Sequence, residues 1–391
     1  MGFYYVKHEN VNVAILEIVG TSITRLQLSE KNKAHFPVGV FTEEQMKKWV
    51  SSRGIPVTRQ RLSVDLQMCD VGSPFELMLR NYGLSLSDHY WICETDCEYT
   101  WETINLYVND FKSAYSLDLR DDKRSIAGKT NFVPSASLQG DLKKKWIIDQ
   151  YGTRRLVKGN YNNTCRQSLC ELLATVIHKL QNRCLYTPYS LIKISSDTQL
   201  ITGCECPNFT SIGTEFIPAI DIIGNLKKPN DMSYYEFYIQ TCLRNGIDVR
   251  CFLEYQLMVD FIISNSDRHL NNFGVLRDSS SLSWISPAPI FDSGNSMFYN
   301  SSYIPVDKAL LKLKVTSFLS KEVQLLGYVR NRGLVDTRLL PDDNYVYMLL
   351  CKDSMIKEEV NERLVRAYRK KIKYFEDFQN GANIWSYTYK G

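Results

Sequence analysis

The pattern of hydrophobic and polar positions divides the chain into three zones. The first zone, residues 1–110, contains a strand-like run, Val11 to Val19, and a helix predicted from Thr42 to Ser51. Thr42 and Gln45 have the spacing of a capping box, in which each side chain caps the other residue's backbone N–H. The segments LSLSDHYWI and WETINLYVNDF could form strand edges, a docking surface or core, and the large area that aromatic residues bury favours core. This zone is interpreted as an N-terminal α/β extension with a possible docking role.

The second zone, residues 111–222, is rich in strand-like runs and contains one clear helix, predicted from Cys165 to Leu180. Residues 223–391 have mainly helical periodicity, with helices expected at 234–244, 249–264 and 356–378. A small sheet with one helix, followed by a helical region, predicts a two-lobed α+β fold. One face of the 165–180 helix is expected to pack in the core through Leu169, Leu172, Leu173, Val176, Ile177 and Leu180.

Composition supports a folded protein and excludes several classes. The chain has 391 residues, of which 44% are hydrophobic, which is enough for packed cores in two or three domains. Its 47 basic and 43 acidic residues leave a net charge of +4, so no direct nucleic-acid binding is expected from bulk charge. The N-terminus lacks the order of a secretory signal, and no run of about 18 apolar residues predicts a membrane span. A cytoplasmic protein without a disulfide framework is expected, because the eleven cysteines are scattered.

Polar residues are unusually dense where one apolar helix ends, in MVDFIISNSDRHLNNFGVL. The predicted helix breaks at residues 264–266, and a short polar turn follows. Further along, the apolar run Ala288 to Phe291 leads directly to Asp292, and Gly294 then permits a sharp turn. These two segments place several groups of catalytic type at element ends: Asp267, Arg268, His269, Asn271, Asn272 and Asp292.

This combination of groups is what phosphoryl transfer requires. The reaction needs a carboxylate for the attacking hydroxyl, an amide and a second carboxylate for Mg²⁺, and a lysine for the nucleotide phosphates. Asp267 and Asn272 have the spacing of a kinase catalytic loop, and Asp292-Ser293-Gly294 takes the place of the kinase Asp-Phe-Gly. Hard oxygen ligands suit Mg²⁺, so Asn272 and Asp292 are the candidate metal ligands.

The lysine should come from a strand of the smaller lobe. Lys158 closes the alternating run RRLVKGNY, and Glu171 on the following helix is its natural ion-pair partner. The lysines at 143–145 are rivals for the same role. The segment PSASLQGDLKKKW has Ser, Ala and Gly ahead of a strand, as expected where backbone amides approach phosphate oxygens, although it is not a Walker A sequence.

On these motifs the chain resembles the HipA-like kinases, a bacterial branch of the protein-kinase fold that includes toxins of toxin–antitoxin pairs. The resemblance rests on SNSDRHLNNFGVLRD with APIFDSGNS, supported by SASLQGDLKKKW, RRLVKG and CELLATVIHKL, and covers roughly residues 130–300. It implies a two-lobed protein-kinase-like fold with residues 111–222 as the N-lobe and 223–391 as the C-lobe. It also implies ATP and Mg²⁺ as cofactors, a protein substrate phosphorylated on Ser or Thr, and a possible antitoxin partner.

The resemblance assigns a role to each site residue. Asp267 would be the catalytic base, Asn272 and Asp292 would bind Mg²⁺, Lys158 would contact the α and β phosphates, and Glu171 would steady Lys158.

Two further loops receive roles in the same way. Ser137, before Gly140, lies where HipA-like enzymes autophosphorylate and eject the loop, with Ser135 as the competing position. GTEFIPAID looks like the hinge between lobes, so backbone groups from Glu215 to Ile217 would meet the adenine.

The motif departs from many protein kinases in the order Asp267-Arg268-His269, where they have His-Arg-Asp. This order also resembles the phosphatidylinositol kinases, so a lipid or small-molecule kinase is the alternative enzyme. A nucleotide-binding pseudokinase that acts through residues 1–110 is the alternative from another class. His269 and Arg268 could each stabilise the transferred phosphoryl group or brace the loop.

Overall fold

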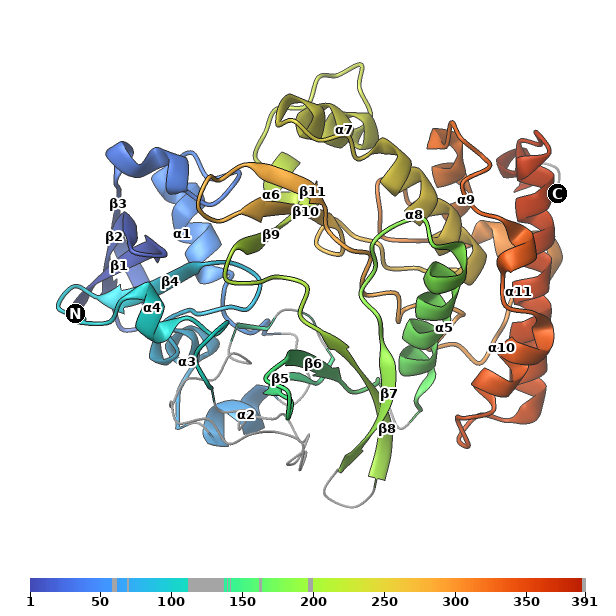
Figure 1. The fold of residues 1–391 in the computed structure, drawn as a ribbon, viewed down its shortest axis with the longest axis horizontal. Coiled ribbons are helices and arrows are strands. Elements are labelled where there is room, and N and C mark those ends of the chain that lie inside the picture. Colours follow the sequence, from blue (N-terminus) through green and yellow to red (C-terminus); the bar gives the residue numbers. More distant parts are fainter. Residues whose placement is uncertain are drawn as a thin grey trace.

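Three sheets and a group of helices make up the described part of the chain, shown as a computed structural model in Figure 1. The structure describes residues 1–57, 62–68, 70–111, 137–138, 140, 142–161, 164–195 and 200–388. The N-terminal strands lie at one end of the molecule and the C-terminal helices at the other, with the two remaining sheets between them.

The N-terminal sheet is antiparallel, with strand order β3-β2-β1-β4. Helix α1 (Glu43–Ser51) begins at the predicted capping box, with Thr42 accepting from the Gln45 N–H and the Gln45 side chain accepting from the Thr42 N–H. The predicted strand and helix of this zone are both confirmed. Its elements are β1 (Gly2–His8), β2 (Val11–Val19), β3 (Ser22–Leu28), η1 (Glu30–His35), α2 (Leu62–Met68), α3 (Pro74–Arg80), β4 (Tyr90–Glu94) and α4 (Trp101–Ile104).

The aromatic-rich segments of this zone are buried, so their interpretation as core is confirmed. Trp91, Trp101 and Phe111 form one apolar cluster with Trp146 of β5 (Lys144–Ile148). Because β5 belongs to the next sheet, this cluster attaches the N-terminal part of the chain to it.

The small sheet has the order β5-β6-β8-β7 and is accompanied by helix α5 (Arg166–Gln181). Its other strands are β6 (Arg154–Lys158), β7 (Ser190–Ser195) and β8 (Leu200–Pro207). The predicted core face of α5 is largely confirmed by Leu169, Leu173 and Ile177, which are buried. The prediction that Leu180 lies in the core is wrong, because its exposed fraction is 46%. It lies in the last turn before the helix ends, where the chain leaves the core at Asn182 in a left-handed conformation.

The third sheet joins segments that are distant in the sequence. It consists of β9 (Thr214–Pro218), β10 (Gly274–Asp278) and β11 (Trp284–Pro287), in the order β11-β10-β9. Strand β9 comes from the zone expected to form the smaller lobe but pairs with β10 of the helical zone. The division of the chain at residue 222 therefore stays a proposal. The following helix α6 (Ala219–Ile223) is bonded to the turn after α8, because its first two amides donate to the carbonyls of Phe273 and Leu270.

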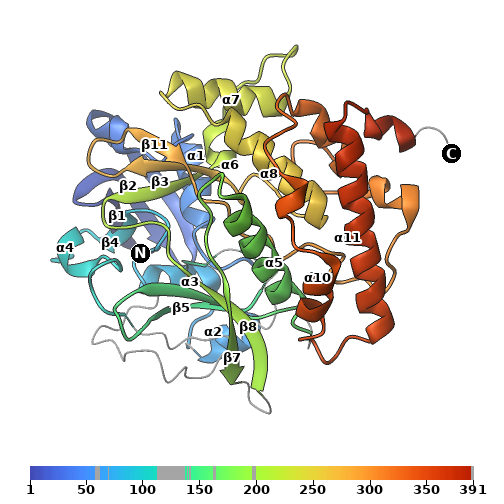
Figure 2. The same cartoon turned by 45° about the vertical axis from the view of Figure 1, so that its right-hand side comes forward.

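The helical part has the largest apolar core. Helices α7 (Tyr234–Arg244), α8 (Arg250–Ile263) and α11 (Glu358–Gln379) lie within two residues of their expected bounds. Figure 2 shows α10 (Asp343–Leu350) and α11 on the side of α5 and α8 that faces away from the N-terminal sheet. Short helical turns connect these elements, namely η3 (Asp307–Lys312), α9 (Glu322–Leu325), η4 (Leu326–Tyr328), η5 (Thr337–Leu339) and η6 (Ile384–Thr388).

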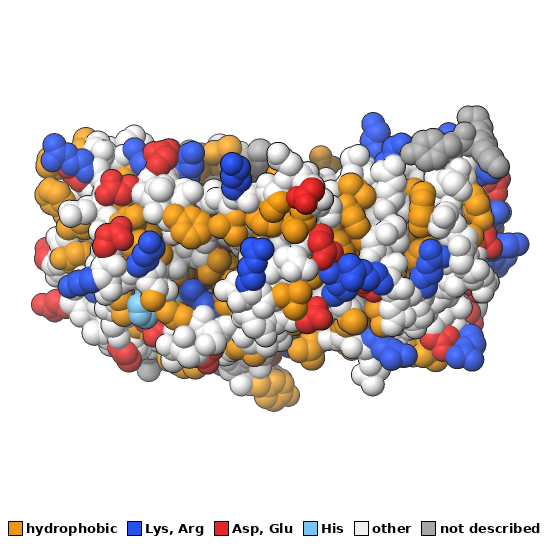
Figure 3. All heavy atoms as spheres, turned by 90° about the horizontal axis from the view of Figure 1, so that it is seen from above, with side chains coloured by type: hydrophobic (Ala, Val, Ile, Leu, Met, Phe, Trp, Pro, Cys, Tyr) orange, Lys and Arg blue, Asp and Glu red, His pale blue; other side chains and the backbone are white. Residues whose placement is uncertain are grey.

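The surface carries both charges. On the face in Figure 3, basic and acidic side chains lie interspersed with hydrophobic ones. None of the helices in the described ranges combines the length and apolar character that a membrane crossing needs.

Candidate active site

The polar turn after α8 is shaped by its own side chains. Helix α8 stops at Ser264, which has a left-handed φ of 56°, and Asn265 donates from Nδ2 to Asp260 Oδ1 over 2.9 Å. Asn265 Oδ1 accepts from the Asp267 N–H at 3.0 Å. Asn272 Nδ2 then donates to the Asp267 carbonyl at 2.8 Å, which closes the turn. Among the hydrogen bonds of the described residues, none reaches the Oδ1 atom of Asn272, so its role as a metal ligand stays a prediction.

Arg268 braces this turn from inside the protein. Its guanidinium makes a two-point ion pair with Asp260, at 2.9 and 3.0 Å, and is almost completely buried. It also donates to the carbonyls of Asn272 and Phe291 and to Ser293 Oγ. Because Phe291 and Ser293 flank Asp292, Arg268 holds the two sequence motifs together. Of the two roles considered for Arg268, these contacts support the bracing one.

Asp292 meets the lysine predicted from the smaller lobe. Lys158 Nζ lies 2.8 Å from Asp292 Oδ1, 2.9 Å from Glu171 Oε1 and 3.1 Å from the Tyr189 hydroxyl. The side chains of Lys158 and Glu171 are only 6% and 3% exposed, whereas that of Asp292 is 35% exposed. Glu171 Oε2 also accepts from the Ser293 N–H at 2.9 Å. Lys158 therefore joins the small sheet, α5 and the Asp292 turn at one point.

Charge pairing favours the ionised forms of Lys158 and Asp292. Burial alone would lower the pKa of Lys158, but the carboxylates of Asp292 and Glu171 hold that pKa well above its ordinary value. Burial would raise the pKa of Asp292, and the opposing charges of Lys158 and Lys144 bring it below its ordinary value. The site thus offers a fixed cation and a partly exposed carboxylate side by side.

Of the rival lysines, Lys144 also faces the site. Antiparallel pairing places Lys144 directly opposite Lys158, so both side chains project from the same face of the sheet. Lys145 projects from the other face and is buried. Gly140 has a φ of +89°, and a Cβ at this position would lie 2.9 Å from Lys144 Nζ. Gly140, the described glycine of the loop predicted to approach phosphates, therefore lies beside a second basic side chain.

Two amide side chains orient Asp267. Asn295 donates from Nδ2 to Asp267 Oδ2 at 2.8 Å, and Gln167 donates from Nε2 to Asn295 Oδ1 at 2.7 Å. Sequence reasoning missed both of them, and it missed Tyr189. Asn295 follows Asp292 by three residues and Gln167 precedes Glu171 by one helical turn, so local spacing could have indicated both. No local signal marks Tyr189.

The remaining catalytic-loop and glycine-loop candidates have fewer contacts. His269 is half-buried, and its Nδ1 accepts from the Asn271 N–H at 3.2 Å. Ser137 has a buried hydroxyl without a hydrogen-bond partner in the described ranges. Ser135 lies outside the described residues. Their roles stay predictions.

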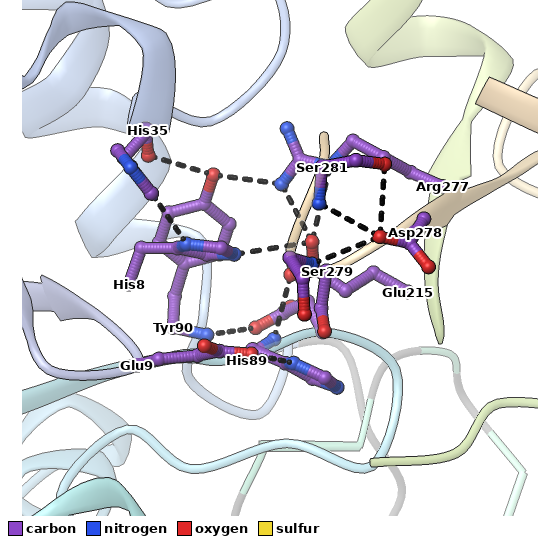
Figure 4. Close-up of polar contacts among 12 residues, drawn as sticks. His8, Glu9, His35, His89, Tyr90, Glu215, Arg277, Asp278, Ser279 and Ser281 are labelled. Carbon is purple, nitrogen blue, oxygen red and sulfur yellow. Dashed lines mark hydrogen bonds and ion pairs between the residues drawn. The ribbon is translucent and has the colours of Figure 1, made fainter. Parts of the chain in front are cut away.

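The structure places Glu215 in a different polar cluster, shown in Figure 4. Glu215 Oε2 lies 2.7 Å from Arg277 Nη2 and 3.1 Å from His8 Nε2, and Oε1 accepts from the His89 N–H at 2.9 Å. The neighbouring Phe216 N–H donates to the carbonyl of Ser87. The Glu215 side chain therefore links the N-terminal sheet to β9 and β10, and is not among the contacts of Asp267 and Asp292.

Ile217, the other end of the proposed hinge, is buried in β9 opposite Val275. Contact of this backbone with adenine stays a prediction.

His89 completes the cluster as a cation. Its Nδ1 lies 2.9 Å from Glu9 Oε1 and its Nε2 lies 2.9 Å from the Ser211 carbonyl oxygen. Both partners can only accept, so both ring nitrogens must carry protons. Burial would lower the pKa of His89, but the bond from Glu9 and the charge of Glu215 raise it above 6.5.

The chain is similar to solved protein structures. No protein-family model and no curated protein matches the chain. The toxin HipA of Shewanella oneidensis MR-1, solved with HipB and its operator DNA, matches with a TM-score of 0.51 and 11% identity. The match covers 95% of this chain and 96% of HipA. The chain has the HipA-like kinase fold. The proinflammatory kinase CtkA of Helicobacter pylori also matches, with a TM-score of 0.43 and 15% identity over 61% of this chain and 94% of CtkA.

The site of this HipA-like fold suits a metal that arrives with a nucleotide. No cluster of three or more His, Cys, Asp or Glu side chains that could hold a metal occurs in the described ranges. Mg²⁺ is commonly held by one or two protein oxygens together with phosphates and water. Asp292 and Asn272 carry oxygen atoms of that type, and Lys158 and Lys144 could balance the charge of phosphates.

Proposed function

We propose that the protein is an ATP- and Mg²⁺-dependent kinase that phosphorylates a Ser or Thr hydroxyl of a protein substrate. The observation that carries the proposal is the contact of Lys158 with both Glu171 and Asp292, three residues from separate segments that the kinase motif assigns to one site. The whole-chain likeness to HipA supports the same fold for that site.

Each residue has a defined task in this reaction. Asp267 accepts the proton of the attacking hydroxyl, whose oxygen forms a bond to the γ-phosphorus as the bond from that phosphorus to the bridging oxygen breaks. Lys158, steadied by Glu171, balances charge on the α and β phosphates. Asn272 and Asp292 would hold Mg²⁺, which would supply positive charge to the phosphates of the departing ADP. Tyr189 and Arg268 hold Lys158 and the Asp292 turn in position.

Partners and location belong to the same proposal. The HipA structure contains the antitoxin HipB, which supports a small antitoxin protein as a partner of this chain. A cytoplasmic toxin restrained by such a partner would phosphorylate a cytoplasmic protein. The order Asp267-Arg268-His269 keeps a lipid or small-molecule kinase as the second candidate.

Labelled ATP with Mg²⁺ tests the reaction. We expect the wild-type protein to transfer label to itself or to added protein, and the Asp267→Ala and Asp292→Ala variants to lose at least about 10²-fold in rate, as when a key charge-stabilising group is removed. Equal labelling by all three proteins would rule out the proposal. Transfer only to lipid headgroups would favour the second candidate.

The orientation of Asp267 by Asn295 predicts a pH effect. Burial raises the pKa of Asp267, and the bond from Asn295 opposes that rise. Since only the ionised carboxylate can accept a proton, the rate should fall as the pH drops through this raised pKa. The Asn295→Ala variant should move the acid limb of the pH–rate profile to higher pH. An acid limb at the wild-type position would mean that Asn295 does not act on Asp267.

A further inference from the structure

A basic segment follows the Asp292 turn. Residues 297–321 contain four lysines, all exposed, and one acidic residue, Asp307. Asp307 lies 3.4 Å from Lys370 of α11, which already supplies it with a basic partner. The segment therefore has an excess of positive charge at the surface, carried by Lys308, Lys312, Lys314 and Lys321.

Two of these lysines face each other across a short hairpin. Lys314 and Lys321 are antiparallel bridge partners, flanked by hydrogen bonds from Val315 N–H to the Ser320 carbonyl and from Glu322 N–H to the Leu313 carbonyl. This is a non-hydrogen-bonded pair, the type in which opposite side chains are closest. Like charges at such positions destabilise the pairing. An anion that contacts both ammonium groups would offset that repulsion.

The hairpin is attached to the catalytic loop. The Thr316 N–H, at its tip, donates to the carbonyl of Ser266 at 2.9 Å, and Ser266 immediately precedes Asp267. At the start of the segment, Arg166 of α5 donates to the carbonyls of Met297 and Ser301. Both attachments come from elements that form the site. The hairpin that carries the lysine pair is consequently anchored at its tip to Ser266, the residue before the proposed base Asp267.

We propose that the hairpin 313–322, through Lys314 and Lys321, docks an acidic segment of the protein substrate next to its phosphorylated Ser or Thr. This inference rests on the proposed kinase function. A carboxylate-rich peptide fits better than nucleic acid, because nucleic-acid affinity comes from many phosphate contacts. Two lysines on a protein of net charge +4 form too small a basic surface to bind nucleic acid through many phosphates.

Peptide binding to the whole protein tests the docking surface. A fluorescent serine peptide flanked by glutamates, measured by anisotropy at low salt, should bind about tenfold more tightly than the same peptide with alanines or lysines. The Lys314→Ala/Lys321→Ala variant should lose about tenfold, or about 1.4 kcal/mol, of that affinity. Raising the salt concentration should weaken binding by the wild-type protein. The matched control is Lys31→Ala/Lys33→Ala, which removes two exposed lysines of η1 and should leave binding unchanged.

The outcomes separate this inference from the kinase proposal. If the wild-type protein turns over ATP but binds the glutamate, alanine and lysine peptides equally, the docking surface alone is overturned. This outcome does not depend on whether the Lys314→Ala/Lys321→Ala variant folds. Preferential binding of the acidic peptide without any ATP turnover would overturn the kinase function and leave the surface. A short single-stranded RNA that binds more tightly than the acidic peptide, and loses affinity in the double variant, would replace the acidic protein as the occupant.

Discussion

Replacing Lys158 with Met is expected to abolish phosphoryl transfer and to destabilise the protein. Lys158 is the only cation that contacts both Glu171 and Asp292 among the described residues. Its loss would remove the proposed contact with the nucleotide phosphates and leave Glu171 buried without its ion pair. Removing one member of a buried pair costs about 3–5 kcal/mol. The rate should fall at least about 10²-fold, as for other preorganised charge contacts. Urea unfolding and label transfer from ATP measure the two effects.

A second substitution distinguishes the catalytic effect from the structural one. The Lys158→Met/Glu171→Gln variant removes the unpaired buried carboxylate and should recover most of the lost stability. It should remain inactive, because no cation replaces Lys158 at the phosphates. Phosphoryl transfer at the wild-type rate by a stable double variant would contradict the role of Lys158. Failure of the double variant to regain stability would instead show that Lys158 stabilises the fold chiefly through Asp292 and Tyr189.

The Glu215→Gln substitution should destabilise the protein by about 3–5 kcal/mol, because it leaves the buried guanidinium of Arg277 without a carboxylate. Burial would raise the pKa of Glu215, but the hydrogen bond from His8 and the charge of Arg277 hold that pKa below its ordinary value of 4.5. Its contribution to stability is therefore present above pH 4.5 and is lost as the pH falls further. Denaturant unfolding across the acidic range should show that the free energy of unfolding depends less on pH in the Glu215→Gln variant than in the wild-type protein.

Two controls define this result. Glu362→Gln breaks the exposed pair with Arg366 in α11 and should cost at most about 0.5 kcal/mol, the usual value for such helical pairs. The Glu215→Gln/Arg277→Met variant removes the stranded cation and should be more stable than Glu215→Gln alone. If Glu215→Gln lowers the free energy of unfolding no more than Glu362→Gln does, the Glu215 cluster does not hold the N-terminal sheet against β9 and β10.

The local pattern of the sequence determined much of the secondary structure. Strand β2 and helix α7 have their expected bounds, and the α1 cap has its expected partners, Thr42 and Gln45. These features depend on side-chain periodicity and on contacts between residues a few positions apart, which a sequence displays directly. The motif residues Lys158, Glu171 and Asp292 could also be selected from the sequence, because Lys158 ends one strand-like run, Asp292 follows another and Glu171 lies on the helix after Lys158.

Only the tertiary structure decided which distant segments meet. The pairing of β9 with β10 brings the side chain of Glu215 to Arg277, and the fold brings His8 to the same carboxylate. Likewise, Asn295 reaches Asp267 only because the Asp292 turn folds back against α8. Burial and hydrogen-bond satisfaction over the whole chain select such contacts, and no local periodicity encodes them. The sequence alone therefore supplied the candidate groups of the site, and the fold determined what surrounds and orients them.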